Sequence, residues 1–204
     1  EVLEPSKLNG SSIKEILLEK LEDSVKKRLV SDVPLGVFLS GGIDSSIITA
    51  LASRHQENLR TFSIGYKNSK FFDEKKYALQ VAKHFDTDHK VFDVTNDDLL
   101  HHLPKILDHF DEPFADSSAI PVYLLSKLTK ENVTVALSGD GGDEMFGGYE
   151  WCRRHQYQIG YRMLPDIARR SLRGKNFDHL DLENEYGNSK TSKLKRLFYD
   201  LNND

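Results

Sequence analysis

The sequence predicts an α/β protein built on a doubly wound, mostly parallel sheet with helices on both faces. Two observations lead to this fold class. Short apolar runs typical of buried strands alternate with stretches whose apolar residues recur at helical spacing, and this alternation implies βαβ units. Two of the strand patterns also run directly into glycine-rich turns, and ligand loops occur at this position in doubly wound sheets.

The 204 residues leave room for one domain and part of another. Residues 1–30 are expected to form an N-terminal helix leading into the domain, in which Ser12 and Glu15 fit a capping box. Residues 31–150 form the predicted core. Residues 151–204 are interpreted as the incomplete start of a helical C-terminal part, because large apolar residues become rare towards the end of the chain.

The elements of the core follow one another in a regular order. Apolar runs or alternation mark the strands, and helical spacing after a Ser or Asp marks the helices. In chain order, the prediction is a strand at 37–39, a helix from 44, a strand at 59–66, a helix over 73–85, a strand at 90–94, helices over 99–110 and 117–128, and a strand at 133–137.

Composition excludes several classes of protein. With 28 basic and 32 acidic residues the formal net charge is −4, which argues against a nucleic-acid binder. The single cysteine, Cys152, cannot form an internal disulfide or a cysteine-based metal site, and it fits a reducing compartment. No apolar stretch approaches the roughly 18 residues of a membrane span. We therefore expect a soluble, cytoplasmic protein without a membrane partner.

The strongest motif is Phe-Leu-Ser-Gly-Gly-Ile-Asp-Ser-Ser at residues 38–46. A strand enters a two-glycine turn and then a helix, so backbone N–H groups at the helix start can approach an anion closely. Asp44 would repel a bare phosphate, and a Mg²⁺ ion held between its carboxylate and the phosphates removes that conflict. The motif is neither a Walker loop nor a dinucleotide-binding turn. The alternative is an ordinary strand–helix turn.

A second motif, Ser-Gly-Asp-Gly-Gly-Asp-Glu at residues 138–144, also follows a predicted strand. Because ligands in doubly wound sheets bind at the carboxyl ends of strands, the two glycine-rich turns can face one pocket. Asp143 is expected to join Asp44 on the metal. Asp140 is expected at a position where its carboxylate can meet substrate. Read alone, this motif could also be a polar loop.

Together these motifs resemble one family of enzymes. The Ser-Gly-Gly-Ile-Asp-Ser string resembles the pyrophosphate loop of N-type ATP pyrophosphatases. Its combination with the Ser-Gly-Asp-Gly-Gly-Asp-Glu-Met-Phe-Gly-Gly-Tyr string is similar to the synthetase domain of glutamine-dependent asparagine synthetases, as are residues 29–36 and 111–118. The resemblance covers roughly residues 15–155. It implies the PP-loop fold of the adenine nucleotide alpha hydrolase type.

The resemblance also implies a reaction. Mg-ATP adenylates the side-chain carboxylate of aspartate with release of pyrophosphate, and ammonia derived from glutamine then displaces AMP to give asparagine. The implied cofactors are ATP and Mg²⁺, and the implied partners are small-molecule substrates and a glutaminase domain in the same intact polypeptide. A homodimer is compatible with the sequence.

The resemblance assigns roles to individual residues. Asp140 takes a catalytic position at which some family members carry Glu, with a part in forming and capturing the adenylate. Asp116, Ser117 and Ser118 are implied at the aspartate site, although a helix-capping turn explains them equally well. The residues implied around the ATP pyrophosphate, adenine and ribose are Leu39, Ser40, Gly41, Gly42, Asp44, Ser45, Ile64, Ser138 and Gly139.

Two parts of the family pattern are missing from this chain. The glutaminase domain should precede it, and a catalytic lysine should follow further downstream, so we expect weak or absent synthesis by these 204 residues alone. Two other functions stay open. One is an adenylating enzyme with another acceptor, such as a β-lactam synthetase-like enzyme, and the other is a non-catalytic nucleotide-binding scaffold.

Overall fold

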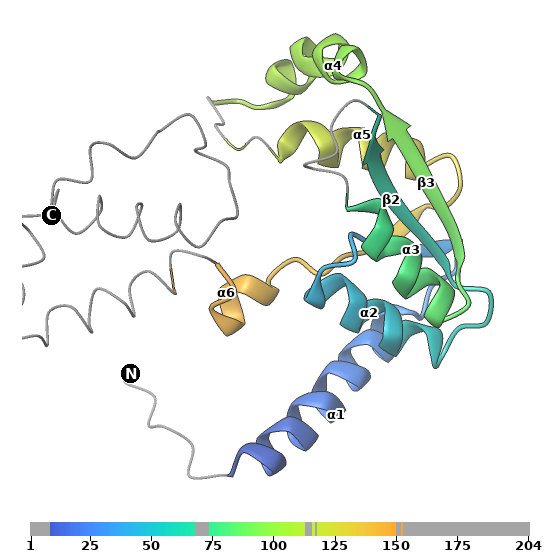
Figure 1. Ribbon diagram of the computed structural model, residues 1–204, viewed down its shortest axis with the longest axis vertical. Helices are drawn as coiled ribbons and strands as arrows, with labels where there is room; N and C mark the ends of the chain where they lie inside the picture. Colours follow the sequence, from blue (N-terminus) through green and yellow to red (C-terminus); the bar gives the residue numbers. More distant parts are fainter. Residues whose placement is uncertain (1–8, 68–73, 113–115, 117, 150–151, 153–204) are drawn as a thin grey trace, which may run out of the picture. The chain divides into compact units, whose positions relative to one another are not determined.

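The computed structural model describes residues 9–67, 74–112, 116, 118–149 and 152 (Figure 1). The chain divides into two compact units, Glu1–Asp140 and Gly141–Asp204, which are considered separately. The predicted helical C-terminal part, residues 151–204, lies outside the described residues except for Cys152.

The first unit contains a four-stranded parallel sheet in the order β3-β2-β1-β4. From β1 the chain adds β2 and β3 on one side, then returns to place β4 on the other side of β1. The order therefore reverses between β1 and β4, which confirms the doubly wound prediction and puts the switch point between these two strands. The strands are β1 (Leu35–Phe38), β2 (Arg60–Tyr66), β3 (Asp88–Val94) and β4 (Val135–Leu137).

Helices connect the strands at the predicted places. In the first unit they are α1 (Gly10–Arg28), α2 (Ile43–Ser53), α3 (Lys75–His84), α4 (Asn96–His109) and α5 (Ala119–Thr129). The second unit begins with the short helix α6 (Gly142–Phe146). β4 starts later than predicted because the N–H of Val133 still donates to the carbonyl of Thr129, which closes the end of α5.

Neighbouring residues of β1 show that helices cover both faces of the sheet (Figure 1). Val37 is buried in a cluster formed with α1 and α2, and Leu39 is buried against α3. Phe38, between them in sequence, packs with Phe62 and with α5. Because successive side chains of a strand point to opposite faces, α1, α2 and α3 lie on one face and α5 on the other. The prediction of helices on both faces is confirmed.

The start of α1 differs from the prediction. Asn9, not Ser12, is the N-cap, and its side-chain oxygen accepts a hydrogen bond from the backbone N–H of Ser12 at 2.8 Å. Ser12 is therefore already inside the helix. Only the C-terminal half of the predicted apolar face is covered in the described structure, since Val25 is buried while Ile13 is 43% exposed.

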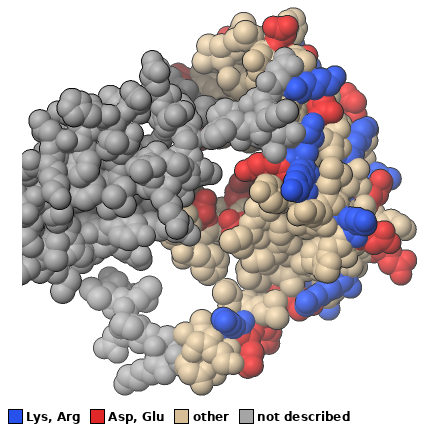
Figure 2. All heavy atoms as spheres, in the orientation of Figure 1, with Lys and Arg blue, Asp and Glu red and all other residues tan. Residues whose placement is uncertain are grey.

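Positive and negative side chains are interspersed on the face of the first unit shown in Figure 2. This pattern agrees with the near balance of 28 basic and 32 acidic residues. Within the described part of the chain, no helix combines the length and apolar character that a membrane crossing needs.

Candidate nucleotide-binding site

The turn between β1 and α2 is shaped by glycine and by the first turn of α3. Leu39 is 1% exposed, and its N–H donates a hydrogen bond to the carbonyl of Phe62 at 2.8 Å. This bond continues the β1–β2 pairing up to the turn. Gly41 follows with φ of +84°, a conformation that favours glycine. A Cβ at Gly41 would lie 2.5 Å from the backbone N of Ala78 and from the carbonyl carbon of Tyr77. Only a residue without a side chain fits there.

The N-terminus of α2 faces the turn without a side-chain cap. Gly42 is the N-cap and has no side chain to bond the first amides of the helix. These amides carry the positive end of the helix dipole, which favours an anion. Asp44 lies in the first turn of α2 and is half-buried. An uncapped helix start beside a carboxylate is suited to phosphate bound together with a cation.

Two serine hydroxyls of the turn bond to each other. Ser40 Oγ lies 2.9 Å from Ser45 Oγ, and it also accepts a hydrogen bond from the N–H of Gly42 at 3.2 Å. Ser45, 8% exposed, in turn donates to the carbonyl of Gly42 at 3.3 Å. The two hydroxyls therefore hold the turn closed with local hydrogen bonds that a phosphate oxygen can replace.

The turn after β4 comes into contact with the start of α2. A Cβ at Gly139 would lie 2.8 Å from the backbone N of Ser45 and 3.0 Å from Cβ of Asp44. Ser138 Oγ donates a hydrogen bond to Asp140 Oδ2 at 2.8 Å, which orients this exposed carboxylate. The structure thus brings Ser138, Gly139 and Asp140 next to the motif that begins at Leu39.

The remaining predicted residues of the first unit lie outside the two glycine turns. Ile64, half-buried, is on β2 beyond Phe62, the last residue that pairs with β1. Asp116 Oδ1 accepts a hydrogen bond from the N–H of Ser118 at 2.8 Å, and this bond holds the pKa of the Asp116 carboxyl below its usual value. That contact supports the helix-capping alternative for Asp116. Ser117 is outside the described residues.

Asp143, the second predicted metal ligand, belongs to the second unit. It lies in the first turn of α6, and its carbonyl accepts a hydrogen bond from the N–H of Gly148 at 3.2 Å. Nearby, the Tyr149 hydroxyl donates to Glu144, and this bond lowers the pKa of the Glu144 carboxyl. Among the described residues, no group of three or more His, Cys, Asp or Glu side chains is arranged to hold a metal. The pairing of Asp44 with Asp143 stays a prediction.

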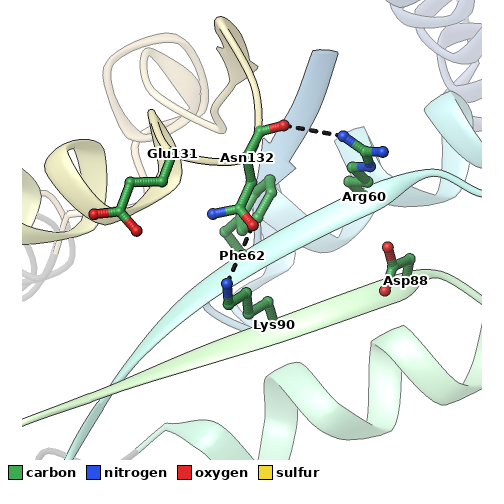
Figure 3. Close-up of a pocket in the computed structure, with 6 residues that line it drawn as sticks. All are labelled: Arg60, Phe62, Asp88, Lys90, Glu131 and Asn132. Carbon is green, nitrogen blue, oxygen red and sulfur yellow. Dashed lines mark hydrogen bonds between the residues drawn. The ribbon is translucent and has the colours of Figure 1, made fainter. Parts of the chain in front are cut away.

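A cavity of about 350 Å³ opens at the opposite edge of the sheet, near the amino ends of β2 and β3 (Figure 3). Arg60 donates to the carbonyl of Asn132 at 2.9 Å, and Lys90 donates to the side-chain oxygen of Asn132 at 3.1 Å. Asp88 and Glu131 supply negative charge beside these cations. The cations of this polar hollow are thus already bonded within the protein, and it lies away from the glycine turns.

Comparison with known proteins decides the family. The family model described as asparagine synthase matches residues 17–204 of the chain. The chain belongs to the asparagine synthase family. It is 44% identical over 154 residues to "Asparagine synthetase [glutamine-hydrolyzing] 1" of Bacillus subtilis, which covers 76% of this chain and 24% of that protein. A putative asparagine synthetase, number 2, of Methanocaldococcus jannaschii is 42% identical, over 73% of this chain and 29% of that protein.

Two solved structures are also similar to part of this chain. An NH3-dependent NAD synthetase from Campylobacter jejuni is similar over 66% of this chain and 60% of that chain, at 19% sequence identity and a TM-score of 0.45. A glutamine-dependent NAD+ synthetase from Acinetobacter baumannii, solved with ADP, is similar over 73% of this chain and 30% of that one, at 21% identity and a TM-score of 0.43.

For this asparagine synthase family chain, sequence reasoning missed the part played by α3. The backbone of Tyr77 and Ala78 lies against Gly41, although the sequence separates the two segments by a whole strand. Lys75, at the start of the same helix, pairs with Asp93 at the end of β3 at 2.8 Å. A lysine at a helix start and an aspartate at a strand end only weakly indicate an ion pair in the sequence. The pairing can be inferred only when the strand order is known.

Proposed function

We propose that this chain is the ATP-binding synthetase part of an amide ligase that activates the side-chain carboxylate of aspartate. The observation that carries the proposal is the contact of Gly139 with Asp44 and Ser45, because it joins both glycine turns at the switch point of the sheet. Family membership supports it. The chain spans 24% of the length of the Bacillus subtilis relative, and the proposed activity is that of a larger polypeptide.

The proposed first step is adenylation. A carboxylate oxygen of aspartate attacks the α-phosphorus of ATP, the bond to the bridging oxygen breaks, and pyrophosphate leaves with the electron pair. Because both reactants are anions, the leaving pyrophosphate must be held by donors and a cation. In the proposal, the first amides of α2 and the hydroxyls of Ser40 and Ser45 supply the donors. Leu39, Ile64, Ser138 and Gly139 contact the rest of the nucleotide.

The proposed metal is Mg²⁺, with Asp44 and Asp143 as its protein ligands. Carboxylate oxygens are suitable ligands for this ion, which in enzymes of this kind neutralises phosphate charge. Asp44 fits this part because it stands in the first turn of α2, where a carboxylate without a cation would oppose phosphate binding. A structure with Asp44 beside bound phosphate is therefore most stable with a cation between them.

The proposed second step is amide formation. Ammonia attacks the carbonyl carbon of the adenylate, AMP leaves, and a proton is lost from nitrogen, which gives asparagine. Asp140 is proposed to assist both the formation of the adenylate and its capture at this carbonyl, and the Ser138 hydrogen bond fixes its orientation. Glutamine, hydrolysed by a glutaminase domain of the same polypeptide, is the proposed source of ammonia, and the cytoplasm is the proposed location.

Pyrophosphate exchange in the complete gene product tests the proposal. Radioactive pyrophosphate should enter ATP only when aspartate and Mg²⁺ are both present. Exchange that depends on a different carboxylic acid would replace aspartate by another acceptor, as in a β-lactam synthetase-like enzyme. Tight ATP binding without exchange for any acceptor would overturn the ligase proposal and favour a nucleotide-binding scaffold.

A further inference from the structure

An ion pair fixes the first turn of α3. Glu74 occupies the N-cap position and makes no side-chain capping hydrogen bond. The next residue, Lys75, places its Nζ 2.8 Å from Asp93 Oδ1. The side chains are 25% and 42% exposed, respectively, so this pair is less exposed to water than the Lys27–Asp23 pair on α1, whose side chains are 72% and 57% exposed.

Gly65 provides the space that this ion pair needs. It pairs directly with Asp93 in the parallel register of β2 and β3. A Cβ at Gly65 would lie 2.3 Å from Cδ of Lys75 and 2.6 Å from Asp93 Oδ1. The lysine stem therefore lies flat across the backbone of β2. Lys75 and Asp93 join three elements at the carboxyl edge of the sheet: the start of α3 and the ends of β2 and β3.

The helix turn held in this way supports the candidate pyrophosphate loop. Tyr77 and Ala78 contact Gly41 so closely that a Cβ there would lie 2.5 Å from their backbone atoms. Ala78, fully buried, also packs with Leu39, the residue just before the turn. A shift of the α3 start therefore presses on the loop or leaves it unsupported, because packed interiors transmit small displacements.

We infer that Lys75 and Asp93 form a positioning pair for the pyrophosphate loop. The pair fixes the first turn of α3, and this turn in turn determines the positions of Gly41 and of the first amides of α2. Neither residue is proposed to touch the nucleotide. The expected effect on ATP binding rests on the proposed function. The support that α3 gives to the loop rests only on the contacts described above.

A double-mutant cycle in the complete gene product tests the inference. Lys75→Met keeps the length of the stem and removes its charge, and Asp93→Asn removes the partner charge. Each variant should weaken Mg-ATP binding by about 10-fold, and the loss in the double variant should be smaller than the two single losses combined, because the variants share the Lys75–Asp93 interaction. In pyrophosphate exchange, the KM for ATP should rise while kcat changes little.

An ion pair on α1, outside the loop and outside α3, supplies the control. Lys27 and Asp23 lie 2.6 Å apart on α1, so Lys27→Met and Asp23→Asn make the same chemical changes there. The control variants should bind Mg-ATP like the wild type. Unchanged ATP affinity in Lys75→Met and Asp93→Asn, or an equal loss in the control pair, would overturn the inference.

Amide hydrogen exchange separates this inference from the proposed function. The amides of residues 40–44 should exchange about 10-fold faster in Lys75→Met than in Lys27→Met, without any nucleotide present. If aspartate-dependent pyrophosphate exchange is missing in the wild type while this difference is present, the proposed function fails and the positioning role stands. If loop exchange is the same in both variants, the positioning role fails whatever the enzyme does.

Discussion

Gly139 and Ser45 are in backbone contact: a Cβ on Gly139 would lie 2.8 Å from the amide nitrogen of Ser45. The two residues are separated by most of the core sequence, and each follows one of the two strands that flank the switch point. Their contact brings the two glycine-rich turns together. Three predictions concern this site, and a fourth concerns His89 on β3.

Gly139→Ala should weaken Mg-ATP binding by about 10-fold or more, because the added methyl group forces the second turn away from α2. Calorimetric titration of the nucleotide measures this effect. Gly10→Ala is the matched control, since a Cβ at Gly10 meets nothing within 4 Å. Wild-type affinity in Gly139→Ala would show that the close contact is not needed for the nucleotide.

Asp44→Asn should reduce the affinity for ATP in the presence of Mg²⁺ by about 10-fold or more, since a first-turn carboxylate is proposed to hold the cation. Without Mg²⁺ the variant should bind ATP at least as well as the wild type, because a repulsive charge is removed. Titrations with and without EDTA compare the two conditions. Asp97→Asn changes a first-turn acid of α4 and should have no effect. An equal loss in both conditions would contradict the metal assignment.

Asp140→Asn should slow aspartate-dependent pyrophosphate exchange by about 100-fold or more and leave the Kd for Mg-ATP nearly unchanged. Asp140 is exposed and is oriented by the Ser138 hydroxyl, so its loss should not disturb packing. Asp140→Glu should keep measurable exchange, because the family resemblance places Glu at this position in some members. Full exchange activity in Asp140→Asn would remove the catalytic role.

His89 should make the stability of the protein depend on pH. Its Nδ1 lies 2.8 Å from Thr61 Oγ1 and its Nε2 lies 3.1 Å from Ser63 Oγ. Burial lowers the pKa of the imidazole, and a hydrogen bond with Thr61 opposes this shift in part. Below the unfolded-state pKa of about 6.5, the unfolded chain therefore binds more protons than the folded chain. The contribution of His89 to stability is present above that pH and is lost as the pH falls through the folded-state pKa.

Urea unfolding at pH 8 and pH 5.5 measures this dependence. The wild type should lose more stability between the two values than His89→Gln, which cannot take up a proton in this range. His109→Gln, on the helix α4, provides a histidine substitution for comparison. The same slope in wild type and His89→Gln would contradict the prediction.

Much of the fold could be predicted because it is encoded locally. The alternation of strand and helix patterns gave the correct order of elements, since burial of one face imposes a period on each segment. The exact ends of the helices and strands were harder to predict than their order. Ser12 fits a capping box as well as Asn9 fits a cap, and only the path of the chain shows that Asn9 reaches the N–H of Ser12. Similarly, Val133 reads as strand, although its N–H closes α5.

The candidate site, like the fold, could be predicted only in part from the sequence. From the sequence alone, the glycine, serine and early aspartate residues between a strand and a helix predicted two candidate phosphate-binding turns. Tertiary structure decided that Gly139 meets Ser45, that α3 supports Gly41 and that Lys75 finds Asp93. These contacts join segments far apart in the chain, and their distances depend on strand order and packing, which no local pattern contains.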